Sequence, residues 1–436
     1  MKAIYNTFFV NKPKTGFVFE EIYMWHDSGS ISFDRWVQPG EHWENPDTKR
    51  RFHGLLNASG LLDKLITIKA RQATKEEILR FHTEEYHDRI VRESEHSKGG
   101  DGGELARFGK GGYEIGALSA GGVIAATEAI IQGKIDNAYC LVRPPGHHAK
   151  SDLGMGFCIF NNVVIGAKHA RHLGLNKIAI IDYDVHHGNG TQDAFWDDPN
   201  TLFISIHQDN NYPIGTGSID EMGGDGAIGS TINIPLPPGS GSGAYRYAFE
   251  RVIIPSLHRF QPDMIFVSSG FDASFSDPLG AQMLSSEDFA FFTRKLMDVA
   301  NVHSKGRILF THEGGYSKDY VPFCGLAVVE TLAEEKTSVV DCYLDECKAK
   351  GYQNCQIHQA AVVDTVASLL DLPVELKALE GLSSAETGVV KVMQSLLSAV
   401  KDPERREMIV ISLLKDTTEE LQRLNEQKLQ SDSTKS

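Results

Sequence analysis

The chain has 436 residues, of which 41% are hydrophobic and 23% charged, and its formal net charge is −15 at pH 7. This length and composition predict a globular protein with a large buried core. The negative charge argues against direct binding of nucleic acid, because phosphate binding needs a basic face. The N-terminal MKAIYNTFFVNK lacks the features of a signal peptide, and we expect no membrane-spanning segment. A soluble, cytoplasmic protein is therefore the starting expectation.

Apolar, β-rich segments recur along the chain and alternate with helical patterns. The expected strands are residues 138–142, 177–181, 201–206, 264–269 and 307–311. The expected helices include 163–173, 245–260 with a kink at Pro255, and 285–304, which begins with Ser285 and Asp288 at capping-box spacing. Near-continuous apolar strands that alternate with helices predict an α/β fold. We expect a single doubly wound, mostly parallel sheet with helices on both faces.

The regions between and after these elements differ in composition. Two Gly-rich stretches, 93–112 and 213–243, are expected to be long surface loops. Beyond residue 372 the pattern changes to a helical, heptad-like periodicity that ends in a polar tail. The sequence therefore predicts a main domain over 1–372 and a C-terminal helical extension over 373–436.

The six cysteines are typical of free thiols in a reducing compartment rather than of a disulfide framework. One group, Cys342, Cys347, Cys355 and His358, contains metal-binding residue types. Its spacings match no common zinc pattern, which argues against a metal cluster there.

The segment DYDVHHGNGTQ directly follows the apolar strand 177–181. Alternate residues of an extended chain share a face, so Asp182, Asp184 and His186 point the same way at the carboxyl end of this strand. Ligands bind at such ends in open α/β sheets. Another predicted strand runs into GFDASFSDP and places Asp272 past its carboxyl end. One such residue alone would be read as a helix cap or a loop histidine, but together they predict a site for a cation such as zinc.

Two other predicted strands also end in reactive side chains. The first runs into RPPGHHA, which places His147 and His148 side by side, and such a pair can divide base and acid work near neutral pH. The second runs into HEGGY and presents Tyr316, whose phenol can donate a hydrogen bond to a developing oxyanion. Taken alone, Tyr316 would be an ordinary interfacial tyrosine.

In order and spacing, the segments RPPGHHA, GFCIFNN, DYDVHHGNGTQ, SSGFDASFSDPLG and EGGY resemble the zinc-dependent histone deacetylase and acetylpolyamine amidohydrolase superfamily. The resemblance is greatest to class II deacetylases and their bacterial homologues, and it covers residues 15 to 370. It implies an arginase/deacetylase-like fold with the active site at the carboxyl ends of the strands. It also implies zinc-dependent hydrolysis of an N-acetylated amine, above all acyl-lysine.

Carried over by position, the resemblance implies a role for each reactive residue. The ligands of one catalytic zinc ion would be Asp184, His186 and Asp272. The acid/base and carbonyl-polarising groups would be His147, His148 and Tyr316. Asp182 would orient His147, and Asn189 would lie near His148. Asp182 and Ser205, with neighbouring carbonyl groups, resemble the structural potassium site of the family.

The resemblance also implies the walls of an acyl-lysine tunnel. These would be Gly156, Phe157, Tyr212 and Leu279. Without the resemblance, the two aromatic residues would be read as core residues. Leu279 falls where polyamine-selective relatives can carry an acidic residue, so a leucine favours lysine substrates. The rim acid that holds the substrate backbone is Asp101 or Glu104, and the sequence leaves this choice open.

Several alternatives remain open at this stage. The substrate could instead be an acetylpolyamine, a longer acyl-lysine or a small metabolite, and a homo-oligomer is compatible with the sequence. A binuclear manganese enzyme of the arginase type would need further bridging carboxylates. A catalytically silent acyl-lysine-binding scaffold would not need the complete set of ligand and acid/base residues. The full set of these residues favours a working enzyme.

Overall fold

The computed structural model of the chain describes residues 12–372, except 30, 33–34, 37–41 and 352. The chain divides into two units, residues 1–372 and 373–436. The helical extension predicted for 373–436 lies outside the described residues.

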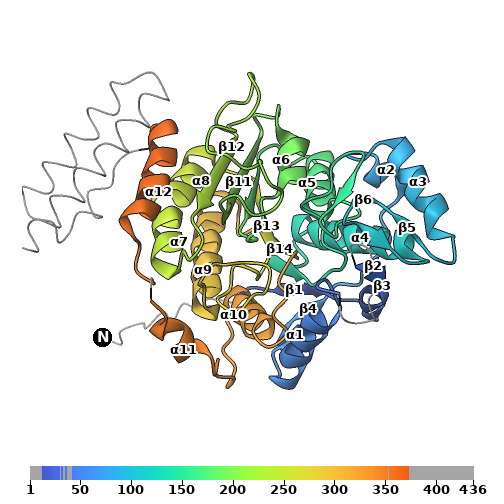
Figure 1. Ribbon diagram of the computed structural model, residues 1–436, viewed down its shortest axis with the longest axis horizontal. Helices are drawn as coiled ribbons and strands as arrows, with labels where there is room; N and C mark the ends of the chain where they lie inside the picture. Colours follow the sequence, from blue (N-terminus) through green and yellow to red (C-terminus); the bar gives the residue numbers. More distant parts are fainter. Residues whose placement is uncertain (1–11, 30, 33–34, 37–41, 352, 373–436) are drawn as a thin grey trace, which may run out of the picture. The chain divides into compact units, whose positions relative to one another are not determined.

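An eight-stranded sheet lies at the centre of the described part, and all of its neighbouring strands pair in parallel (Figure 1). Its strands, in sheet order, are β12 (Thr231–Leu236), β11 (Thr201–Gln208), β10 (Ile178–Asp182), β13 (Met264–Ser269), β14 (Ile308–His312), β8 (Asn137–Cys140), β1 (Thr15–Val18) and β4 (Ile66–Thr67). The predicted parallel α/β sheet is confirmed. Strands β10, β13, β14 and β8 are neighbours in its middle although they are far apart in the sequence.

Helices cover both faces of this sheet. Within β10, Ala179 and Ile181 belong to one hydrophobic core, whereas Ile178 and Ile180 belong to the other. The first core includes residues of α1 (Asp47–Ala58), α7 (Ser242–Ala248), α8 (Ile254–Phe260), α9 (Ser286–His303), α10 (Val321–Ala333) and α12 (Ile357–Leu369). The second includes residues of α4 (Gly112–Ile131), α5 (Asn162–His172) and α6 (Asn189–Phe195). The fold is therefore doubly wound, as predicted.

Apart from α3, the remaining described elements are short. They are η1 (Glu21–Trp25), β2 (Ile31–Ser32), β3 (Arg35–Trp36), η2 (Leu62–Lys64), α2 (Lys75–Ile78), α3 (Glu84–Ser94), β5 (Gly100–Asp101), β6 (Gly103–Glu104), β7 (Arg107–Phe108), β9 (Gly154–Met155), η3 (Phe249–Ile253) and α11 (Leu344–Ala349).

The predicted helices are confirmed, including their irregular points. Asp288 accepts hydrogen bonds from the backbone nitrogen and the hydroxyl of Ser285, each 3.0 Å long, where α9 begins. The helix expected over 245–260 contains a π-helical turn, η3, that ends at Ile253, two residues before Pro255. Proline lacks an N–H and crowds the carbonyl four residues earlier, so the regular hydrogen-bond pattern breaks at this point.

One of the loop expectations needs correction, and one apolar helix was not expected. The stretch 213–243 is not all loop, because it contains β12 at the edge of the sheet, where the missing N–H of Pro235 is tolerated. Helix α4 is long and apolar enough to cross a membrane by length and composition, which the sequence interpretation missed. However, 72% of its apolar window is buried inside the protein, where it packs against α5 and β8. All six cysteines are free, as predicted.

Candidate active site

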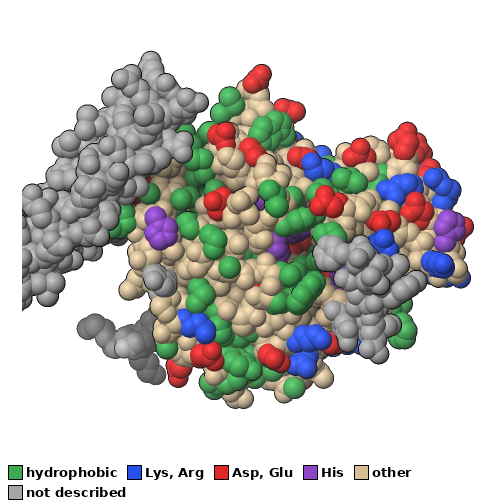
Figure 2. Space-filling model, viewed as in Figure 1, with side chains coloured by type: hydrophobic (Ala, Val, Ile, Leu, Met, Phe, Trp, Pro, Cys, Tyr) green, Lys and Arg blue, Asp and Glu red, His purple; other side chains and the backbone are tan. Residues whose placement is uncertain are grey.

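The predicted reactive side chains follow the carboxyl ends of four neighbouring strands. Strand β8 is followed by His147 and His148, β10 by Asp184 and His186, β13 by Asp272, and β14 by Tyr316. All of these side chains are buried. Figure 2 shows histidine and acidic side chains near the centre of one face, between hydrophobic side chains. The sheet order therefore brings segments that are far apart in the sequence to one place.

Asp184, His186 and Asp272 form a group that could hold a metal ion. Their ligand atoms all lie within 4.8 Å of one another. Nδ1 of His186 lies 3.0 Å from Oδ1 of Asp184 and 3.3 Å from Oδ2 of Asp272. This Oδ2 is buried and forms no hydrogen bond within the described part of the chain. A buried carboxylate oxygen without a donor is costly, and a bound cation would satisfy it.

The surrounding backbone is shaped to leave this space open. A Cβ atom at Gly314 would lie 2.0 Å from Oδ2 of Asp272 and 2.7 Å from Oδ2 of Asp184. The Gly314 amide instead donates a 2.8 Å hydrogen bond to that Asp184 oxygen. Two carboxylates and one imidazole suit a borderline divalent cation such as zinc, and three protein ligands leave a position for water or substrate. The residues present therefore fit a catalytic metal site.

The two adjacent histidines lie beside this group and have different partners. Nδ1 of His147 lies 2.9 Å from Oδ2 of Asp182, and its Nε2 lies 3.8 Å from Oδ2 of Asp184. Nδ1 of His148 lies 2.8 Å from Oδ1 of Asn189, which can only accept, so Nδ1 carries the hydrogen. In its neutral form, His148 then has Nε2 free to accept a proton.

Burial and neighbouring charges separate the pKa values of this pair. Burial lowers the pKa of His147, but the carboxylates of Asp182 and Asp184 outweigh this effect and raise it to about 10. Burial lowers the pKa of His148 well below its ordinary value, and the positive charges of His147 and His186 lower it further. The two imidazoles, whose ring centroids are 4.0 Å apart, therefore differ in their readiness to accept a proton.

Tyr316 is held by its backbone and remains protonated. Oδ2 of Asp277 accepts hydrogen bonds from the amides of Tyr316, at 2.7 Å, and Ser317, at 3.3 Å. Burial raises the pKa of the Tyr316 phenol well above its usual value, and the carboxylates of Asp272 and Asp184 raise it further. The phenol can therefore donate a hydrogen bond at neutral pH.

A tight turn presents Phe157 to the site. Met155 and Cys158 pair across it, and the two residues between them, Gly156 and Phe157, have φ angles of +50° and +70°. A Cβ atom at Gly156 would lie 2.4 Å from Cδ2 of His148, so only glycine fits beside this imidazole. The Phe157 ring packs edge-on against Tyr316, with centroids 6.0 Å apart.

The remaining predicted wall residues lie on loops that are hydrogen-bonded to each other. The Tyr212 ring packs edge-on against His148, with centroids 5.0 Å apart. Its neighbour Asn211 donates a 3.2 Å hydrogen bond to the carbonyl of Leu279, which is half-buried. Aromatic rings thus flank both the histidine pair and Tyr316.

The two candidate rim acids lie in different surroundings. Asp101 accepts a 3.0 Å hydrogen bond from the Gly103 amide and pairs with Arg107. Burial raises the pKa of Tyr212 above its ordinary value, and the nearby Glu104 carboxylate raises it further. Glu104 is exposed, and its carbonyl accepts a hydrogen bond from the Gly156 amide. Glu104 is therefore the acid that borders the predicted tunnel walls.

Ser205 lies beside Asp182, as strands β11 and β10 pair these two residues in register. Both are fully buried, and the Ser205 hydroxyl lies 2.8 Å from Nδ1 of His207. Asp182 thus contacts His147 through its carboxylate and lies beside Ser205 of the neighbouring strand β11.

The sequence interpretation gave no role to the buried residue Glu313. One of its carboxylate oxygens accepts hydrogen bonds from the amides of Gly146, at 2.7 Å, and His147, at 3.1 Å. The hydroxyl of Ser268 donates to the other at 3.2 Å. Burial raises the pKa of Glu313 to about 7. An acid directly after an apolar strand, within HEGGY, was the available signal.

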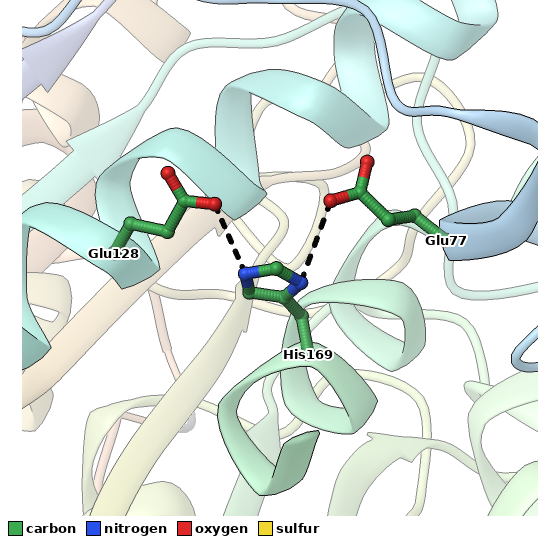
Figure 3. Close-up of side chains that lie close together, drawn as sticks. All are labelled: Glu77, Glu128 and His169. Atoms are coloured by element: carbon green, nitrogen blue, oxygen red, sulfur yellow. Dashed lines mark ion pairs between the residues drawn. The ribbon is translucent and has the colours of Figure 1, made fainter. Parts of the chain in front are cut away.

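A second group of possible ligands, Glu77, Glu128 and His169, lies between α2, α4 and α5 (Figure 3). Arg71 already bridges it, with Nη2 2.7 Å from Glu77 and 2.8 Å from Glu128. Arg80 lies 2.6 Å from Nδ1 of His169. The two arginines balance the two carboxylates, so this group is an ion-pair cluster that needs no metal.

Comparison with known proteins agrees with this geometry. Residues 42–332 match the Histone deacetylase domain family. The chain belongs to this family. It is 44% identical to a histone deacetylase-like amidohydrolase of Pseudomonas aeruginosa over 75% of this chain and 88% of that protein. It is 36% identical to a probable deacetylase of Archaeoglobus fulgidus over 73% of this chain and 86% of that protein.

A solved structure shares the fold of the family. The crystal structure of the HDA15 HD domain is 31% identical and superposes with a TM-score of 0.73, covering 82% of this chain and 96% of that one. The family match confirms the resemblance on which the site residues were predicted. Family membership implies a metal cofactor and an acetylated amine substrate, and it supports a hydrolase.

Proposed function

We propose that this protein is a zinc-dependent deacetylase that hydrolyses the amide bond of acetyl-lysine. The observation that carries the proposal is the convergence of Asp184, His186 and Asp272 next to two histidines with different partners. Tyr316, whose phenol stays protonated, follows the carboxyl end of β14, the strand next to β13. A purely binding protein would not need a proton acceptor beside a metal group.

Asp184, His186 and Asp272 would hold the zinc ion. When bound, zinc acts as a Lewis acid and lowers the pKa of a coordinated water molecule. Val185 donates a 2.7 Å hydrogen bond to Oδ1 of Asp272, and Gly314 donates to Asp184. These bonds orient the carboxylates and leave Oδ2 of Asp272 available as a ligand.

His148 would accept the proton of the attacking water at Nε2. Its Nδ1–H bond to Asn189 fixes the tautomer that makes this atom the acceptor. Asp182 holds His147 in its charged form and in a fixed orientation. A proton then passes from the histidine pair to the leaving amine as the C–N bond breaks, which yields acetate and the free amine.

The phenol of Tyr316 would donate a hydrogen bond to the oxygen of the amide carbonyl. This oxygen gains negative charge as water adds, so the hydrogen bond strengthens in the transition state. Asp277 fixes the backbone of Tyr316 so that the donor is in place before the reaction.

The walls of the site favour a substrate with an extended alkyl chain. Phe157 and Tyr212 offer aromatic surfaces to the methylene groups of a lysine side chain, and half-buried Leu279 offers an apolar one. A polyamine carries additional positive charge and would gain most from an acid at the position of Leu279. Glu104, near Tyr212, would accept a hydrogen bond from the substrate backbone. We also assign a structural potassium ion near Asp182 and Ser205, on the strength of the family resemblance.

A substrate panel on the zinc-loaded protein tests the proposal. The panel contains acetyl-lysine peptides, acetylpolyamines and longer acyl-lysine peptides, and a hydroxamate chelator is the inhibition control. We expect the highest kcat/KM for acetyl-lysine and complete inhibition by the hydroxamate. Faster acetylpolyamine hydrolysis would reassign the substrate. No turnover of any acetylated amine would contradict the proposal.

A further inference from the structure

Three charged side chains are buried together beside Tyr316. Glu44, Lys49 and Arg143 are each only 1% exposed. Oε1 of Glu44 accepts hydrogen bonds from Nζ of Lys49, at 2.9 Å, and from Nε of Arg143, at 2.8 Å. Fully buried lysine and arginine side chains are rare in proteins, and burying a charge is costly. Such a cluster therefore calls for an explanation beyond general stability.

Arg143 uses its donors on structural partners. Nη1 donates to the carbonyls of Tyr23 and His26, at 3.0 and 2.6 Å. Nη2 donates to the hydroxyl of Ser28 and to the carbonyl of Glu44, at 3.1 and 3.2 Å. Lys49 differs, because within the described part of the chain Glu44 is the one hydrogen-bond partner of its ammonium group.

The cluster carries an excess positive charge. It contains two cations and one carboxylate, and the two neighbouring histidines do not change this count. Burial lowers the pKa of His26 to about 3, and burial lowers that of His312 well below its ordinary value. Both imidazoles are therefore neutral at pH 7. Glu44 contacts both cations and balances one of their two positive charges, so one positive charge remains in the cluster.

Lys49 lies against the phenol of the active site. Its Nζ is 5.9 Å from the centroid of the Tyr316 ring, within the range of a cation–π contact. We propose that Lys49 is a positioning residue for the deacetylation reaction, which holds the Tyr316 ring and places a fixed positive charge beside the phenol. This inference rests on the proposed function.

The physical reason is the charge that develops during the reaction. Negative charge appears on the oxygen next to the Tyr316 phenol only as water adds to the amide carbonyl. The buried Lys49 cation against the ring makes the phenol O–H a stronger donor to this oxygen, and the effect is larger than in water because the local dielectric constant is low. The stabilisation is specific to the transition state, so Lys49 should affect kcat and leave KM nearly unchanged.

The test compares variants at Lys49 on an acetyl-lysine peptide. In Lys49→Met the charge is lost, yet Glu44 keeps its pair with Arg143, so no buried charge is left alone. We expect kcat to fall about tenfold, on the scale of a desolvated cation–π contact, with KM nearly unchanged. Lys49→Arg should recover most of the loss. Lys318→Met is the matched control, because Lys318 is two residues from Tyr316 but 41% exposed and paired with Asp47.

A double-mutant cycle with Tyr316→Phe separates positioning from general structural damage. If Lys49 acts through the phenol, Lys49→Met should cause little further loss of kcat in the Tyr316→Phe background. Equal losses in both backgrounds would overturn the inference, as would a Lys49→Met variant with the parental kcat. If Lys49→Met does not fold, Lys49→Gln takes its place, with thermal unfolding as the check. A parental protein that is inert on every acetylated amine would instead overturn the proposed function.

Discussion

The backbone amide of Tyr316 donates a 2.7 Å hydrogen bond to Oδ2 of Asp277. The other oxygen of this carboxylate accepts a 2.9 Å hydrogen bond from the amide of Leu279. One buried side chain thus connects the loop that carries the phenol with the loop that carries a predicted wall of the substrate tunnel. The position of the phenol and the shape of the tunnel therefore depend on the same residue.

Asp277→Asn should reduce activity more than stability. The amide group has one acceptor oxygen in place of two, so either Tyr316 or Leu279 loses its hydrogen bond. We expect kcat to fall roughly tenfold to a hundredfold, because small displacements of a catalytic donor are costly. Steady-state kinetics on an acetyl-lysine peptide measures this. Ser276→Ala is the control. The hydroxyl of Ser276 forms a 3.0 Å hydrogen bond with that of Ser317 on the exposed side of the same loops.

Tyr316→Phe removes the phenolic donor and keeps the ring. We expect kcat to fall by roughly 10² to 10³, or about 3 kcal/mol of transition-state stabilisation, as for other lost oxyanion donors. The metal content and thermal unfolding of the variant should match those of the parent. Parental rates in this variant would show that the phenol is not the oxyanion donor.

Gly156→Ala tests the close approach of the backbone to His148. The new Cβ would lie 2.4 Å from Cδ2 of His148 and 2.9 Å from Cε1 of Tyr212, so the imidazole must move. Gly133→Ala is a matched control, because Gly133 also has a positive φ angle, +69°, but no atom within 4 Å of its added Cβ. Both variants carry backbone strain of roughly 1 kcal/mol. Only Gly156→Ala should lose most of its activity.

The metal content should be one zinc ion per chain, held by the Asp184 group. Asp272→Asn should lower the bound zinc well below one equivalent, because it replaces the carboxylate whose oxygen lacks a donor. His169→Gln should bind zinc like the parent, because arginines already balance the charges of its cluster. Elemental analysis after dialysis measures both variants. Two manganese ions per chain would instead indicate a binuclear enzyme.

Stability should fall in acid because buried histidines must stay neutral. Nε2 of His82 accepts a hydrogen bond from the Asn161 amide at 3.0 Å, and burial lowers the pKa of His82 to about 3. The unfolded chain binds a proton below an ordinary histidine pKa of about 6.5, whereas the folded protein does not. The free energy of unfolding should therefore fall by up to about 1.4 kcal/mol per pH unit for this residue, between pH 6.5 and pH 3.

Urea unfolding as a function of pH measures this slope. His82→Gln cannot titrate, so its stability should depend less steeply on pH than that of the parent over the same interval. The same substitution at the exposed residue His172 is the control and should leave the slope unchanged. An identical pH dependence in His82→Gln and the parent would contradict the assignment.

The sequence by itself determined the strands near the site and predicted the candidate reactive residues. The apolar run before Asp182 and the alternation of Asp182, Asp184 and His186 are local patterns, and they identified a strand and the face of its polar end. The motifs around His147 and Tyr316 were recognisable for the same reason. Strand β12 was missed, because the glycine and proline residues around its few apolar positions are typical of a loop.

The tertiary structure alone decided which residues meet. The order of strands in a sheet depends on packing between distant segments, so only the fold places β8 beside β14 and β10 beside β13. The burial of Lys49 was likewise invisible in the sequence, because lysine is usually exposed. Its partner Glu44 pairs with Arg143, 99 residues further along the chain. Contacts between distant segments form only when the whole core assembles, and local sequence patterns carry no record of them.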